Sequence, residues 1–106
     1  MLVVSRFRVP EHEQATFRDE LERARKTLAT QRGFRTGRIG RNVDDPELWV
    51  LATEWDGPGA YRRALSTYDV KLAAVPTLSR ALDEPSAYEV VEPGAELNER
   101  EARSLG

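Results

Sequence analysis

Apolar residues recur along this chain with two different periods, and the changes from one period to the other predict six elements. An alternation of period two is typical of β-strands, whereas apolar residues spaced three and four apart indicate one buried face of a helix. The predicted order is strand 2–9, helix 11–31, strand 34–43, strand 47–55, helix 58–75 and strand 87–92.

The two predicted helices each carry one apolar stripe. Their boundaries follow from Pro10 before acidic residues, Gly33 as the expected C′ residue, and Asp56 as the expected N-cap before Pro58. Pro76 is expected to end the second helix, after a break near residues 66–69, and 78–82 to add a further turn. The stripes are Phe17, Leu21, Ala24 and Leu28 in the first helix, and Tyr61, Leu65, Tyr68, Leu72 and Val75 in the second.

This order of elements is the split βαβ arrangement of ferredoxin-like domains. The predicted fold class is therefore α+β, a βαββαβ chain whose four-stranded antiparallel sheet carries both helices on one face. The other face is left bare, although strand 47–55 is apolar on both of its faces. A monomer would then expose tryptophan, leucine and valine, which soluble monomers rarely do over a large area. We expect two copies to pack bare face to bare face as a homodimeric α/β barrel.

Composition narrows the functional classes. The chain has 106 residues and a formal net charge of −2, which gives no electrostatic reason to expect nucleic acid or an anionic membrane as a partner. It has no cysteine, and its single histidine, His12, stands in a predicted first helical turn, so no metal site is expected. No apolar run is long enough to span a membrane and no signal-like segment opens the chain, so the cytoplasm is the expected compartment.

One segment resembles a known family. The strand Leu48-Trp49-Val50-Leu51-Ala52-Thr53-Glu54-Trp55, followed by Asp56-Gly57-Pro58-Gly59-Ala60-Tyr61, is similar to the corresponding segment of antibiotic biosynthesis monooxygenase-like dimeric α/β barrels. The opening strand, the Gly33-Phe34 pair and the Asp44-Asp45-Pro46 turn also resemble that family. The resemblance covers residues 1–92, leaving 93–106 as a polar C-terminal tail.

The resemblance implies several chemistries, because such barrels serve different functions. One branch oxygenates quinone-like aromatic molecules with neither metal nor flavin, since the electron-rich substrate itself reduces oxygen. A haem-degrading branch relies on an asparagine, a tryptophan and a histidine, whose places are taken here by Arg6 or Phe7, Ala64 and Val75. Haem degradation is therefore disfavoured, and Val75 also speaks against the autoinducer-processing branch.

The preferred function is accordingly a cofactor-independent monooxygenase acting on an aromatic or quinone-type small molecule. Glu54 is the predicted base and Arg6 or Arg38 the predicted oxyanion-stabilising group, while Trp49, Trp55, Tyr61 and Tyr68 are expected to wall the pocket. The alternative is a non-catalytic dimeric barrel that binds a small apolar ligand or acts as an interaction module. For Glu54, a structural ion pair with Arg6, Arg8 or Arg38 is the first interpretation, and for the aromatic residues it is core packing.

Overall fold

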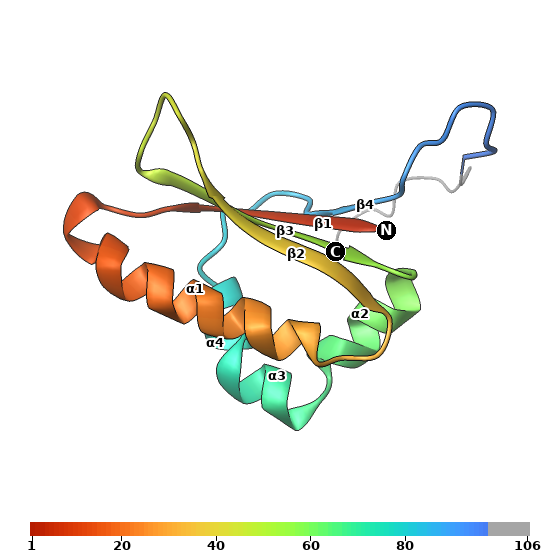
Figure 1. Cartoon of the computed structure of the whole chain (residues 1–106), viewed down its shortest axis with the longest axis horizontal. Helices are drawn as coiled ribbons and strands as arrows, with labels where there is room; N and C mark the ends of the chain where they lie inside the picture. Colours follow the sequence, from red (N-terminus) through yellow and green to blue (C-terminus); the bar gives the residue numbers. More distant parts are fainter. Residues whose placement is uncertain (98–106) are drawn as a thin grey trace.

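The fold is built on one four-stranded antiparallel sheet, and the helices pack against one face of it (Figure 1). The computed structural model describes residues 1–97, and the sheet order is β2-β3-β1-β4. Its elements are β1 (Leu2–Arg8), η1 (Glu11–Glu13), α1 (Gln14–Ala29), β2 (Phe34–Arg41), β3 (Leu48–Trp55), α2 (Pro58–Leu65), α3 (Tyr68–Ala73), α4 (Val75–Leu78) and β4 (Ala87–Tyr88). This confirms the predicted α+β fold class and ferredoxin-like order.

The core lies between the sheet and the helices. Every second residue of β3 is buried on the helix side, namely Trp49, Leu51, Thr53 and Trp55. Strand β1 contributes Val3, Ser5 and Phe7 in the same way, because pleated strands turn successive side chains to opposite faces. The predicted apolar stripe of α1 covers this layer of side chains. Its residues Phe17, Leu21, Ala24 and Leu28 are all at most 1% exposed.

The opposite side of the sheet, called here the open face, has no helix of residues 1–97 over it (Figure 1). Register places twelve residues on it: Leu2, Val4, Arg6, Arg8, Thr36, Arg38, Gly40, Leu48, Val50, Ala52, Glu54 and Tyr88. The expectation that tryptophan stands on this face was wrong, since both Trp49 and Trp55 lie under the helices. The open face instead carries an apolar band, formed by Leu2, Val4, Leu48, Val50 and Ala52, which is bordered by charged side chains.

Several predicted boundaries shift. The second helix is divided into three short helices, because the backbone at Thr67 is extended and Pro76 lies in the first turn of α4 instead of ending a helix. Asp56 does not cap α2; Gly57 takes that position, and the Asp56 carboxylate accepts a hydrogen bond from Arg35. Strand β4 has only two residues, shorter than the predicted 87–92.

Gly33 joins α1 to β2 at a point where only glycine fits. It is not the C′ residue of α1, since the helix already ends at Ala29, but its φ of +88° is the left-handed conformation that favours glycine. A Cβ atom at this position would lie 2.5 Å from the Cβ atom of Ala60 in α2. The carbonyl of Gly33 also accepts a hydrogen bond from the backbone N–H of Asp56, at 2.8 Å. This glycine therefore allows α2 to pack closely against the start of β2.

The segment between α4 and β4 runs along the edge of β1 that faces away from β3. The backbone N–H of Leu82 donates to the carbonyl of Arg6 at 2.8 Å, and that of Val4 donates to the carbonyl of Ser86 at 2.7 Å. Between these two bonds, the Arg6 guanidinium donates twice to the Glu84 carboxylate, at 2.7 and 2.9 Å. A forked pair of this kind fixes geometry as well as adding attraction.

Replacing Gly33 by alanine should destabilise the protein by about 2–4 kcal/mol, because the left-handed backbone and the contact with Ala60 both oppose a side chain. Urea unfolding followed by circular dichroism measures the change. Gly59→Ala is the matched control: its nearest neighbour is the flexible end of Arg63, and alanine is favoured in helices. Equal stability of Gly33→Ala and the wild type would contradict this packing.

The Arg6–Glu84 pair should make stability depend on pH. Hydrogen bonds from Arg6 hold the pKa of the Glu84 carboxyl below its usual range, so the folded state favours the ionised form. This contribution is present above the unfolded pKa, about 4.3, and is lost as pH falls through the lowered folded value. Glu84→Gln should therefore lower the melting temperature at neutral pH, and the difference should disappear in acid. A difference independent of pH would contradict this assignment.

Candidate functional site

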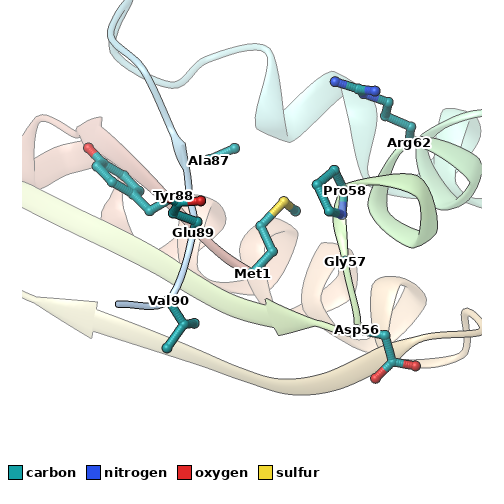
Figure 2. Close-up of a pocket in the computed structure, with 9 residues that line it drawn as sticks. All are labelled: Met1, Asp56, Gly57, Pro58, Arg62, Ala87, Tyr88, Glu89 and Val90. Carbon is teal, nitrogen blue, oxygen red and sulfur yellow. The ribbon is translucent and has the colours of Figure 1, made fainter. Parts of the chain in front are cut away.

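A cleft opens where α2 begins and β4 ends (Figure 2). Its volume is about 570 Å³. Figure 2 shows Met1 in the middle of the lining residues, with the side chains of Pro58 and Arg62 on one side of it and Ala87 on the other. The lining consists of Met1, Asp56, Gly57, Pro58, Arg62, Ala87, Tyr88, Glu89 and Val90.

The base of this cleft is fixed by backbone bonds at the end of β3. The N–H of Trp55 donates to the carbonyl of Met1 at 2.8 Å, which holds Met1 beside the strand. Strand β4 pairs with β1 through Leu2 and Val3, so it brings Ala87 and Tyr88 to the same end of the sheet. The cleft thus combines residues distant in sequence because the first and last strands are neighbours.

An aromatic cluster adjoins the cleft on the helix side of the sheet. The Trp55 ring is fully buried, with ring centroids 5.3 Å from both Phe34 and Tyr61. Its indole N–H donates to the Thr53 hydroxyl at 2.9 Å, so its polar atom is satisfied. Burial raises the pKa of the half-buried Tyr61 phenol, which keeps this hydroxyl protonated and suited to donate a hydrogen bond.

Arg62 gives the cleft its available positive charge. Within residues 1–97, its exposed side chain makes no hydrogen bond or ion pair. Asp56 is differently placed, because its carboxylate accepts a 2.7 Å hydrogen bond from the Nε of Arg35. An anionic oxygen entering the cleft would therefore find an unengaged guanidinium, whose planar donors suit oxyanions. Methionine, proline, alanine and valine side chains supply apolar lining around it.

The residues predicted as one site lie on the two opposite faces of the sheet. Glu54, Arg6 and Arg38 are all on the open face, whereas Trp49, Trp55 and Tyr61 are on the helix side. None of the first three lines the cleft. A pleated strand sends neighbours such as Glu54 and Trp55 to opposite sides, so one chain does not bring these two groups into one pocket.

The predicted partners of Glu54 are also different. Arg6 binds Glu84, Arg8 lies 3.0 Å from Asp45, and Arg38 is exposed. The ion-pair contact of Glu54 is with Arg35, at 4.0 Å, a residue that bulges out of the register between β2 and β3.

None of the four predicted pocket walls lines the cleft: Trp55 and Tyr61 belong to the adjoining cluster, and the other two lie farther away. Trp49 is six residues before Trp55 on β3, or about 20 Å along an extended strand. It lines a separate groove of about 500 Å³ between α1 and β2, and its indole N–H is buried without a partner among the described residues. Tyr68 begins α3 and is 76% exposed, so it packs neither in the core nor in the cleft.

None of the residues that line the cleft was predicted as a site residue. The predicted Asp56-Gly57-Pro58 turn located one side of the cleft, and the i, i+4 spacing from Pro58 to Arg62 could have placed that arginine on the same helix face. The other side depends on the pairing of β4 with β1, which residue patterns do not specify.

Residues 1–97 contain neither a cluster suited to a metal ion nor a helix suited to span a membrane. No group of three or more histidine, cysteine, aspartate or glutamate side chains in residues 1–97 is placed to hold a metal ion. Within the same residues, no helix has the length and apolar character required to cross a bilayer.

Known structures share this architecture. SnoaB, described as a cofactor-independent oxygenase from Streptomyces nogalater, is 26% identical with a TM-score of 0.65, over 76% of this chain and 80% of its own. An antibiotic biosynthesis monooxygenase homologue from Nitrosomonas europaea is 16% identical with a TM-score of 0.67, over 86% and 98%. A conserved protein from Methanosarcina mazei is 19% identical with a TM-score of 0.66, over 81% and 84%. The last two, at such identities, show the fold alone.

No curated protein matches the chain in sequence. The family model for antibiotic biosynthesis monooxygenases, however, matches residues 1–75, from β1 into α4. This match spans well over half of the chain and includes the Leu48–Tyr61 segment whose pattern first suggested the family. The chain belongs to the antibiotic biosynthesis monooxygenase family.

Proposed function

We propose that this protein is a cofactor-independent oxygenase that acts on a small electron-rich aromatic molecule, such as a hydroquinone or a related polycyclic phenol. The observation that carries the proposal is the family match over residues 1–75, together with the likeness to SnoaB, a cofactor-independent oxygenase. The cleft beside α2 is the proposed binding site, because it joins apolar side chains to the unengaged guanidinium of Arg62.

The proposed reaction needs no redox group from the protein. The phenol, or the ring CH₂ of an anthrone-type substrate, loses a proton to solvent, and a hydrogen-bearing ring carbon of the resulting phenolate or enolate gives its electrons to O₂ as a C–O bond forms. The hydroperoxide then loses water and leaves a carbonyl, so one oxygen atom enters the product and the other leaves as water. Arg62 would stabilise the phenolate and enolate oxygen, a contribution of the oxyanion-hole kind. Glu54, Arg6 and Arg38, on the other face, take no part in this version of the site.

The alternative function is a barrel that binds a small apolar ligand without chemistry. It is favoured by one observation: no carboxylate of the predicted catalytic set lies at the cleft, and Asp56 is engaged by Arg35. The two functions differ in whether binding of a hydroquinone is followed by consumption of oxygen.

Oxygen uptake with a panel of hydroquinones and anthrone-type phenols tests the proposal. Arg62→Gln should lower kcat/KM about 10–1,000-fold, by loss of an oxyanion-stabilising donor. Arg63→Gln, its exposed neighbour, is the matched control, and Glu54→Gln should also retain activity because it lies on the open face. Ligand binding without oxygen consumption would establish the non-catalytic alternative, and loss of activity in Glu54→Gln alone would return the site to the open face.

We also propose that the protein acts as a homodimer joined through the open face. Light scattering at micromolar concentration should give about twice the 12.0 kDa mass of one chain. Val50→Asp, at the half-buried centre of the open face, should shift the mass toward one chain, because burying a carboxylate there is costly. Leu72→Asp, on the exposed surface of α3, is the control. A single-chain mass for the wild type would contradict the dimer.

A further inference from the structure

Some charged side chains of the open face have an ion-pair partner within the chain, and others do not. Arg6 is engaged by Glu84 and Arg8 by Asp45, both within the chain. These two arginines can therefore become buried together with their counter-charges, which lowers the cost of removing them from water.

Arg38 is different, since its exposed guanidinium makes no hydrogen bond or ion pair in the described part of the chain. It is opposite Ala52 in the register of β2 and β3, next to the apolar band. An interface that covers Val50 and Ala52 therefore reaches Arg38 as well. A guanidinium buried there without a partner would weaken the interface, because an unpaired ion loses its hydration without a compensating attraction.

Glu54 is the complementary case. Its side chain keeps 34% of its exposure, and its ion-pair contact among residues 1–97 is Arg35, at the 4.0 Å limit. Arg35 is itself committed to Asp56, at 2.7 Å. The open face thus carries one cation without a counter-charge and one carboxylate that is only weakly engaged.

In a two-fold interface the same face is presented twice, so a group lacking a partner must find it among the groups of that face. Within residues 1–97, Glu84 and Asp45 are already paired in each chain, so Glu54 is the open-face carboxylate available to Arg38. In the sheet, Glu54 is opposite Thr36 and Arg38 is opposite Ala52, so the two are diagonal neighbours on adjacent strands near the apolar band. A two-fold axis that crosses the strands between them would place Arg38 of one chain against Glu54 of the second copy, and Glu54 of the first against Arg38 of the second.

We propose that Arg38 of each chain pairs with Glu54 of a second copy, and that these two symmetric ion pairs set the register of the dimer. This inference rests on the proposed open-face dimer and adds its specific contacts. It also gives Glu54 and Arg38 a role in assembly in place of the catalytic roles expected from the sequence.

Charge reversal tests the pairing in the full chain. Arg38→Glu and Glu54→Arg, measured separately by sedimentation equilibrium, should each raise the dimer dissociation constant about 30-fold or more, as breaking close interfacial charge pairs does. The double variant carries both charges exchanged, so it should recover to within about threefold of the wild type. Arg63→Glu, on the exposed surface of α2, is the matched control and should leave the constant unchanged.

The neutral variants Arg38→Gln and Glu54→Gln give a second measurement that does not depend on charge repulsion. Their combined effect should be clearly less than the product of the two single effects, since both remove the same pairs. A wild-type dimer whose dissociation constant is unchanged by either reversal, or reversals whose effects simply multiply, would overturn the pairing and leave the dimer intact. A wild-type monomer would overturn the dimer itself.

Discussion

The alternation of side chains along β3 is the constraint on which the rest of this molecule depends. Strand β3 pairs on one side with β1 and on the other with β2, so its pleat sets the direction of side chains across most of the sheet. Trp49, Leu51 and Trp55 face the helices and Leu48, Val50 and Ala52 face away. A one-residue slip would exchange these two sets and place both tryptophans on the open face.

The two faces of the sheet therefore carry two different proposed roles, ligand binding on one and association with a second copy on the other. On the helix side, the buried Trp55 cluster and the turn at Gly57 form a fixed end of the sheet beside the cleft, and Arg62 brings a cation to it. On the open face, apolar residues and engaged ion pairs make a surface suited to a second copy. Glu54 and Trp55 are neighbours in sequence, yet they belong to different surfaces.

The fold could be predicted from periodicity because the buried residues of each element lie on one face. The spacing of Leu21 and Leu28 predicts the helix α1, and the alternation of Trp49 and Leu51 predicts the strand β3. The cleft was only half predictable. Its α2 side is a local feature of the Asp-Gly-Pro turn, whereas Ala87 and Val90 reach it through long-range pairing of the last strand with the first. The predicted site set combined residues such as Glu54 and Trp49 without regard to the pleat, which places them on opposite faces of the sheet. The predicted polar tail lies partly outside the described residues, beyond position 97, and its boundary stays a prediction.

The separation of the two faces can be measured directly by amide chemical shifts during titration of the isotopically labelled protein with a hydroquinone. Shifts concentrated at Gly57, Arg62, Ala87 and Val90, with Arg38, Val50 and Glu54 unchanged, are the result expected if the ligand binds on the helix side. Shifts centred on Arg38, Val50 and Glu54 would contradict this separation of the two faces and place the ligand on the open face.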